Sequence, residues 1–159
     1  MTVSPETDAG EAISPDLIER LRSRFRDHPV QRHLNLEILA LELDRCLMKL
    51  HFTPEVDNGA GNIHGGVLAS LADTAMACAL CTNFDGKMGF ATSNLNIYYL
   101  RRARTSVVAH AEVIKKGKKL CVGQVAIRDS DEQLVATVTC EFMLTTSTFV
   151  KPSQQSSDE

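Results

Sequence analysis

The chain has 159 residues and a mass of 17.5 kDa, which suits a single domain with one hydrophobic core. Lys and Arg number 17 and Asp and Glu number 20, so the formal net charge is −3 and the chain lacks the broad basic surface that nucleic acid requires. We expect neither a membrane partner nor a secretory signal, because no apolar run approaches the roughly 18 residues of a membrane span and the first residues are acidic.

The first predicted element is a helix that begins near Ser14. Ser14 can cap the helix, Pro15 suits its first turn, and Asp16 lies beside the positive end of the helix dipole. We expect the helix to end at His28, because the residue before a proline disfavours helical geometry. One face of this helix collects the apolar residues that would contact a core, which are Leu17, Ile18, Leu21 and Phe25.

Alternation of apolar and polar residues predicts that most of the remaining chain is β-strand. A period of two with one polar face is typical of an antiparallel sheet that is buried on one side. Short turn signals at residues 43–45, 116–118 and 129–131 separate the strands. The predicted strands are Cys46–Phe52, with another strand before the first turn, and then Gly89–Tyr99, Val107–Val113, Cys121–Arg128 and Leu134–Leu144.

The segment His64–Asn83 breaks this alternation, because it is rich in Ala and Leu and is apolar nearly all round. Such a helix is buried on most of its faces. One central helix cannot supply the repeated crossovers of a doubly wound sheet. We therefore predict an α+β hotdog fold, in which a curved antiparallel sheet wraps around one long helix, with a short N-terminal helix. A single domain is expected over residues 14–146, with flexible tails at residues 1–13 and 147–159.

The five cysteines are an odd number and fall inside apolar patterns, so we expect reduced core thiols of a cytoplasmic protein. Cys78 and Cys81 form a CxxC pair, for which zinc binding and redox chemistry are the alternatives. A structural zinc site needs a second close pair, and a redox pair usually sits where a helix begins. Neither condition holds in this sequence, and we expect no metal.

The segment Asn58–Asp73 carries the residues best suited to chemistry. The N–H groups of Gly65 and Gly66 fall in the first turn of the helix, where they have no intrahelical partner and the dipole favours a developing oxyanion. The alternative is that the two glycines only allow a tight turn. Asp73 is either a general base or nucleophile in an apolar helix, or a helix-surface residue at the solvent edge of the sheet.

His64 and Asp73 are separated by nine residues. On a helix this spacing is a rotation of roughly 900° and a rise of about 13.5 Å, so the two side chains lie on opposite faces. If both act on one bond, His64 and Gly65 must come from one subunit and Asp73 from another. The spacing therefore predicts a homo-oligomer, either a dimer or a dimer of dimers, with shared sites.

Asn58, the triplet His64–Gly66, Asp73 and the strand sequence ATSNLNIYYLR at residues 91–101 together resemble the phenylacetate-degradation branch of the hotdog acyl-CoA thioesterases. The resemblance extends over roughly residues 34–145. It implies hydrolysis of an acyl-CoA with an aryl, short-chain or medium-chain acyl group, giving the free acid and coenzyme A. It implies no cofactor, because coenzyme A is part of the substrate.

The same resemblance assigns roles to individual residues. It implies that Asp73 is the general base or nucleophile and that the Gly65 N–H binds the carbonyl oxygen. Asn58 and His64 would hold the thioester and the water, and Thr92 occupies the place of a Ser or Thr that orients the water. One departure from the family pattern is Arg102, which stands where proline is common.

Two basic clusters, Arg101–Arg104 and Lys115–Lys119, are candidates for binding the phosphates of coenzyme A. The alternative for the lysine cluster is a solvated turn. The substrate-binding residues predicted beside the catalytic ones are Gly66, Arg101, Arg104 and Lys118.

Three other functions stay open. They are a hotdog dehydratase or hydratase acting on acyl thioesters, a non-catalytic acyl-CoA-binding protein, and an assembly subunit with a vestigial site.

Overall fold

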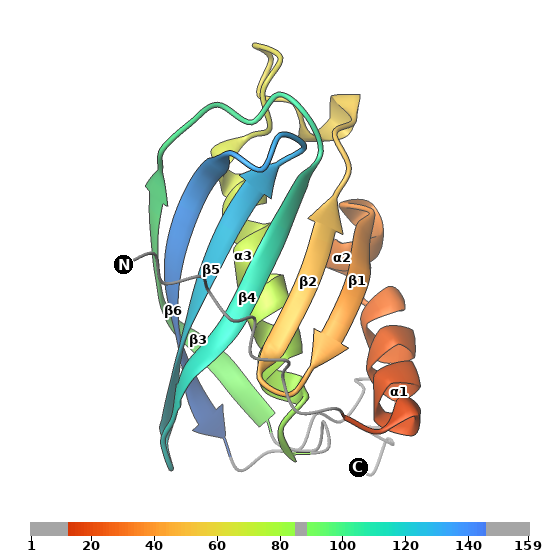
Figure 1. Ribbon diagram of the computed structural model, residues 1–159, viewed down its shortest axis with the longest axis vertical. Coiled ribbons are helices and arrows are strands. Elements are labelled where there is room, and N and C mark those ends of the chain that lie inside the picture. Colours follow the sequence, from red (N-terminus) through yellow and green to blue (C-terminus); the bar gives the residue numbers. More distant parts are fainter. Residues whose placement is uncertain (1–12, 85–88, 146–159) are drawn as a thin grey trace, which may run out of the picture.

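The computed structural model describes residues 13–84 and 89–145. One six-stranded antiparallel sheet curves around the long helix α3 (Gly65–Cys81), which confirms the predicted hotdog fold (Figure 1). Helices α1 (Pro15–Arg26) and α2 (Pro29–His33) precede the sheet, and the short 3-10 helix η1 (Pro54–Val56) precedes α3. The strands are β1 (Leu36–Glu42), β2 (Arg45–Leu50), β3 (Gly89–Tyr99), β4 (Val107–Lys116), β5 (Leu120–Asp129) and β6 (Leu134–Thr145).

The predicted tails at residues 1–13 and 147–159 lie outside the described residues, apart from Ile13, which packs against the core. The Ser14 cap of α1 is confirmed, because its Oγ accepts a hydrogen bond of 3.2 Å from the Leu17 N–H. Pro29 does follow the end of α1, but it also begins the five-residue helix α2, which the sequence did not predict. No helix in the described part of the chain is long and apolar enough to cross a membrane.

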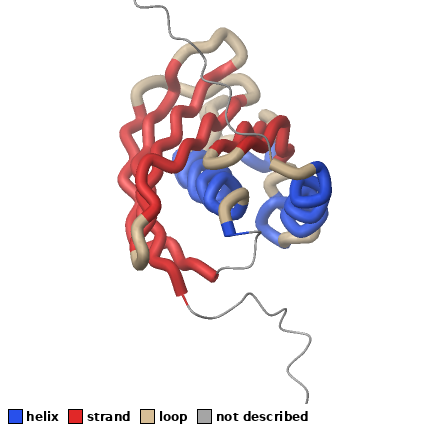
Figure 2. The backbone as a smooth tube through the Cα atoms, turned by 60° about the horizontal axis from the view of Figure 1, so that its bottom comes forward, coloured by secondary structure: helices blue, strands red, loops and turns tan. Residues whose placement is uncertain are grey.

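The order of strands in the sheet is β1-β2-β4-β5-β6-β3, and every neighbouring pair is antiparallel. The connection through α3 therefore carries the chain from β2 to the far edge of the sheet, where β3 pairs with β6. Figure 2 shows the sheet wrapped around α3, with α1 and α2 on the other side of that helix. Alternate residues of the strands point at α3, and Cys46, Met48 and Leu50 of β2 are completely buried there.

Helix α3 is buried along most of its surface, as its composition predicts. Leu71, Ala72 and Ala75 have no exposed surface, and Gly123 of β5 leaves the space that the Met76 side chain fills. After the first turn, the residues of the helix that are not buried form a half-buried stripe, and their spacing places them on one face. This half-buried stripe consists of Ala69, Ser70, Asp73, Thr74 and Ala77.

The two edge strands of the sheet differ in how they are protected. The β1 edge carries a bulge between Ile38 and Ala40, and the Arg22 guanidinium of α1 donates to the Ile38 and Leu39 carbonyl oxygens at 2.6 and 3.3 Å. Strand β3 pairs with β6 alone, and within the described ranges no element bonds to its other edge. An unprotected edge strand is a surface on which another strand can add.

Candidate functional site

Asp73 and Thr92 form one part of the candidate site. Asp73 lies on the half-buried stripe of α3, and Thr92 lies on β3, next to a bulge between Thr92 and Asn94. The Thr92 hydroxyl donates a hydrogen bond of 2.8 Å to Asp73 Oδ1. Among the described residues, Oδ2 of Asp73 has no hydrogen-bond partner. The pair therefore presents one fixed and one free carboxylate oxygen at the margin between the helix and the edge of the sheet.

The cysteines around this site are not nucleophiles. Cys140 of β6 lies near Asp73, and burial, reinforced by the negative charge of Asp73, raises the pKa of its thiol to about 12. Burial also raises the pKa of the Cys81 thiol to about 11 and that of Cys78 well above its ordinary value. All five thiols are free and buried, as predicted, and a protonated buried thiol is chemically inert. No cluster of potential metal ligands occurs in the described part of the chain.

A second part of the site lies at the N-terminus of α3. His64 is the N-cap residue, and its Nδ1 accepts a hydrogen bond of 3.0 Å from the Gly66 N–H. The accepting nitrogen carries no proton, so the proton of the neutral ring is on Nε2, which is then a donor. Within the described residues the Gly65 N–H has no acceptor. The free donor at this helix end is thus Gly65, whereas the predicted substrate-binding N–H of Gly66 is already engaged.

The loop before α3 is a tight turn that presents Asn58. Asp57 Oδ1 accepts hydrogen bonds from the N–H groups of Gly59 and Gly61 at 2.6 and 3.1 Å. Both glycines have positive φ angles, 85° and 71°, which side chains at these positions would strain. Asn58 Oδ1 accepts from the Ala60 N–H at 2.9 Å, so its amide nitrogen is the group that remains for a ligand.

A cleft of about 400 Å³ connects this loop to the start of α3 and the end of β3. Of the predicted site residues it includes Asn58, Gly65 and Arg101; it does not include Asp73 or Thr92. One chain therefore brings the predicted residues together in two separate groups rather than in one site. The residues around the cleft are Asn58, Ala60, Asn62, Ile63, Gly65, Leu68, Tyr99, Arg101, Arg102 and Ala103.

One lining residue, Tyr99, was not predicted as part of a site. Arg102 was expected as a member of the basic cluster Arg101–Arg104, and it lines the cleft beside Arg101, in the segment that follows β3. Tyr99 is the last residue of that strand, and its position over the helix start depends on the tertiary fold.

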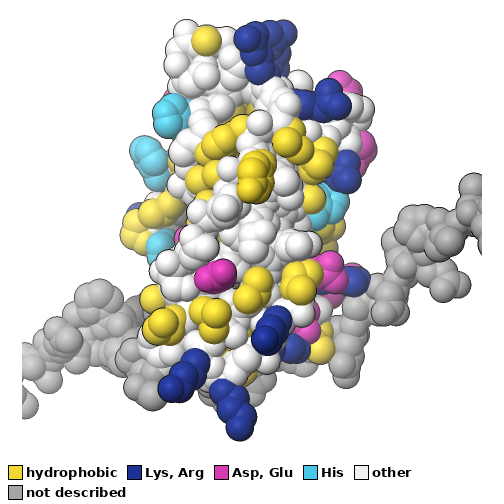
Figure 3. Space-filling view, turned by 90° about the vertical axis from the view of Figure 1, so that its left-hand side faces the viewer, with side chains coloured by type: hydrophobic (Ala, Val, Ile, Leu, Met, Phe, Trp, Pro, Cys, Tyr) yellow, Lys and Arg dark blue, Asp and Glu magenta, His cyan; other side chains and the backbone are white. Residues whose placement is uncertain are grey.

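The basic residues lie at the two ends of the molecule. Arg104 is exposed and follows the cleft residues, whereas Lys118 is in the turn between β4 and β5. The neighbouring Lys116 Nζ donates to Asp44 and Asn83 at 2.7 and 2.9 Å, beside the C-terminal end of α3. That end is about 25 Å from the cleft, the length of a 17-residue helix. Figure 3 shows basic side chains gathered at the upper and lower ends of one face. Within one chain, Lys118 does not reach the cleft.

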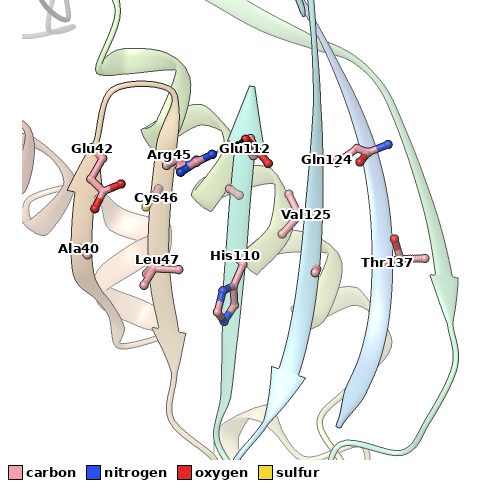
Figure 4. Close-up of a pocket in the computed structure, with 12 residues that line it drawn as sticks. Ala40, Glu42, Arg45, Cys46, Leu47, His110, Glu112, Gln124, Val125 and Thr137 are labelled. Atoms are coloured by element: carbon pink, nitrogen blue, oxygen red, sulfur yellow. Dashed lines mark hydrogen bonds and ion pairs between the residues drawn. The ribbon is translucent and has the colours of Figure 1, made fainter. Parts of the chain in front are cut away.

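A larger hollow of about 650 Å³ lies on the opposite side of the sheet from α3 (Figure 4). Leu47, His110 and Thr137 point into it from three strands, and an ion pair of 3.0 Å between Arg45 and Glu112 lies at its side. Burial lowers the pKa of His110. No predicted site residue lines this hollow, and we assign it no part in the chemistry below.

Comparison with known proteins shows which proteins this chain resembles. The model of the thioesterase superfamily matches residues 60–136. The acyl-coenzyme A thioesterase PaaI of Escherichia coli K12 is 28% identical over 120 residues, which cover 74% of this chain and 84% of that protein. The 1,4-dihydroxy-2-naphthoyl-CoA hydrolase of Listeria monocytogenes is 27% identical over 112 residues, covering 70% and 91%.

Solved structures agree on the fold. The structure of the E. coli PaaI protein from the phenylacetic acid degradation operon superposes with a TM-score of 0.78 at 23% identity, covering 86% of this chain and 99% of that one. The thioesterase HI1161 of Haemophilus influenzae superposes with a TM-score of 0.74 at 24% identity, covering 80% and 89%. These structures show that the chain has the hotdog fold, and the match to the family model over residues 60–136 shows that it is similar to the thioesterase superfamily.

Proposed function

We propose that this protein hydrolyses acyl-CoA thioesters to the free acid and coenzyme A, in a site that two copies of the chain share. The observation that carries the proposal is the Asp73 carboxylate, which the Thr92 hydroxyl holds at 2.8 Å beside the open edge of the sheet. The unpaired N–H of Gly65, at the start of the same helix, supplies the second element of the reaction. The similarity of residues 60–136 to the thioesterase superfamily also supports the proposal.

The chemistry needs a base or nucleophile and an oxyanion donor. Asp73 either takes a proton from water as the water oxygen attacks the thioester carbonyl carbon, or attacks that carbon itself and is released by water afterwards. The carbonyl oxygen becomes negative in the tetrahedral intermediate and accepts a hydrogen bond from Gly65 at the positive end of α3. The intermediate then collapses, the carbon–sulfur bond breaks, and coenzyme A leaves as a thiolate. A thiolate is a good leaving group, so the reaction needs no strong acid.

The distance between the two parts of the site supports a dimer. Eight residues of α3 separate Gly65 from Asp73, a rise of about 12 Å, and the cleft at Gly65 excludes Asp73. The β1 edge of the sheet is covered by α1, whereas β3 is open. Pairing of two β3 strands about a two-fold axis would place the half-buried stripe of one α3 near the cleft of the other chain. A dimer of dimers would repeat this unit.

The cleft also supports the coenzyme A part of the substrate. Arg101 and Arg102 line it, and Arg104 follows them, so that phosphate groups would meet guanidinium groups at the cleft entrance. The two relatives named above act on a 1,4-dihydroxy-2-naphthoyl thioester and on acyl-coenzyme A, which supports a substrate with an aryl or alkyl acyl group.

A hydrolysis screen over aryl- and alkyl-CoA thioesters, with detection of the free thiol, tests the proposal. Asp73→Asn is nearly isosteric and should lower kcat on the best substrate by about 10²- to 10⁴-fold, the usual effect of losing a general base. Asp16→Asn, which changes a highly exposed carboxylate on α1, is the matched control. Binding of acyl-CoA without turnover would favour the non-catalytic alternative, and wild-type kcat in Asp73→Asn would refute the assigned mechanism.

A further inference from the structure

Tyr99, the last residue of β3, contacts the first residue of α3. Its hydroxyl donates a hydrogen bond of 2.8 Å to the carbonyl oxygen of Gly65. A Cβ atom on Gly65 would lie 3.3 Å from both Cζ and Oη of Tyr99. The phenol ring therefore covers the side of Gly65 on which other residues carry a side chain, and its hydroxyl joins the end of β3 to the start of the helix.

The sheet holds Tyr99 in place from the other side. Tyr99 pairs with Ala136 of β6, and the next two N–H groups, those of Leu100 and Arg101, both donate to the Val135 carbonyl oxygen at 2.8 and 3.1 Å. The backbone on both sides of the tyrosine is thus bonded to β6. A rigid strand end, rather than a free loop, carries the phenol to the helix.

The peptide groups on both sides of the Gly65 Cα are held by hydrogen bonds, and Tyr99 contributes to the second of them. Two successive glycines have wide conformational freedom, which would otherwise let the Gly65 N–H change direction. The preceding carbonyl, that of His64, accepts from the N–H groups of Val67 and Leu68 at 2.9 and 3.2 Å. The following carbonyl, that of Gly65, belongs to the first turn of α3 and also accepts from Tyr99. With both neighbouring peptides held, the N–H of Gly65 keeps one direction.

The same peptide group links Tyr99 to His64. The carbonyl of the Gly65–Gly66 peptide accepts from Tyr99, and the N–H of that peptide donates to His64 Nδ1 at 3.0 Å. Hydrogen bonds in series polarise one another, so a donor on the carbonyl strengthens the N–H as a donor. We propose that Tyr99 is a positioning residue for thioester hydrolysis, which holds the oxyanion donor of Gly65 and the ring of His64 through one peptide group.

The inference rests on the proposed function, because it assigns Tyr99 to the oxyanion site of that reaction. Tyr98 provides an internal comparison. It precedes Tyr99 on the same strand, and both side chains are exposed, at 63% for Tyr98 and 52% for Tyr99. Within the described residues the Tyr98 hydroxyl makes no hydrogen bond. The two tyrosines therefore differ in the contact that the inference depends on, while their chemistry is the same.

Tyr99→Phe keeps the ring and removes only the hydroxyl. We expect kcat to fall by about 3- to 10-fold, the effect of one hydrogen bond, with KM changed by less than about twofold, because the substrate does not bind the hydroxyl. Tyr98→Phe should leave both constants at the wild-type values. An unchanged kcat in Tyr99→Phe would overturn the inference, and so would an effect confined to KM, which would make Tyr99 a substrate-binding residue.

Amide hydrogen exchange tests the same contact without relying on turnover. The Gly66 N–H should exchange faster in Tyr99→Phe than in the wild type and should be unaffected in Tyr98→Phe, because only the former loses the hydrogen bond from Tyr99 to its peptide group. Equal exchange in all three proteins would overturn the inference. If the wild type hydrolyses no thioester, the proposed function fails, and the exchange experiment still decides whether Tyr99 holds this peptide.

Discussion

Thr92 of β3 donates a hydrogen bond to Asp73 of α3, with 2.8 Å between Oγ1 and Oδ1. The contact joins an edge strand to the central helix at a carboxylate that would otherwise face solvent at the margin of the core. It occupies one carboxylate oxygen and leaves Oδ2 for water or for the thioester carbon. The resemblance implied that Thr92 orients the water; the structure gives it a direct bond to the carboxylate.

We expect Thr92→Val to lower kcat by about tenfold, because the carboxylate loses the hydrogen bond that sets its orientation. Valine has nearly the same shape as threonine, so β3 should keep its pairing with β6. Thr92→Ser retains the hydroxyl and should recover most of the activity. Steady-state kinetics on the best thioester gives the kcat of both variants. If Thr92→Val and Thr92→Ser behave alike, the hydroxyl has no role in the reaction.

One substitution can separate the role of His64 in the reaction from its structural role as a helix cap. In His64→Asn the side-chain oxygen can replace Nδ1 as the acceptor for Gly66, but the donor at Nε2 is lost. We expect kcat/KM to fall by about 10- to 100-fold, as for a lost hydrogen bond to a developing charge, while the melting temperature changes little. His28→Asn is the control for the same substitution at another helix start, since His28 is the N-cap residue of α2 and its side chain makes no capping hydrogen bond. Wild-type kinetics in His64→Asn would make His64 a cap alone.

Much of the fold follows from local patterns in the sequence. The period of two along Leu134–Leu144 predicts a half-buried strand, and the apolar composition of residues 64–83 predicts a buried helix. The short helix α2 escaped prediction because His28 before a proline indicates only where the first helix ends. Nor does alternation distinguish a central strand from an edge strand, so the position of β3 required the structure.

In the candidate site, too, some features could be predicted from the sequence and others required the structure. Gly65 and Asp73 are recognisable because an unpaired N–H at a helix start and a carboxylate in an apolar helix are locally unusual. The engagement of Gly66 by His64 depends on a side-chain rotamer, which sequence spacing does not determine. Tyr99 comes to Gly65 only because β3 crosses to the edge beside the start of α3.

The shared site predicts complementation between inactive variants. Gly65→Pro removes the N–H at the first helical position, where proline is well tolerated, and Asp73→Asn removes the carboxylate. Each variant alone should be inactive. A mixed dimer has one intact site of two, so an equal mixture after subunit exchange should recover about a quarter of the wild-type activity.

Gly65→Ala is the control for this experiment. It adds a Cβ at the same distance of 3.3 Å from Tyr99 but keeps the N–H, so it separates crowding from the loss of the donor. Light scattering at the assay concentration gives the oligomeric state. A fully active monomer, or a mixture that stays inactive although subunit exchange is complete, would contradict the shared site.

The arginines at the cleft should act on the nucleotide part of coenzyme A. Arg101 lines the cleft and Arg104 is exposed just beyond it, so Arg101→Ala and Arg104→Ala should each raise KM for acyl-CoA several-fold, with kcat mostly unchanged, because binding to a distant phosphate is equal in the ground and transition states. The KM for a pantetheine thioester without the nucleotide should change little.

Lys118→Ala is the control for these two variants. Lys118 lies near the other end of α3, and only a partner chain could bring it to the cleft. Equal KM increases on both substrates would mean that the arginines shape the acyl-binding part of the cleft, and no increase on either would mean that they are solvated.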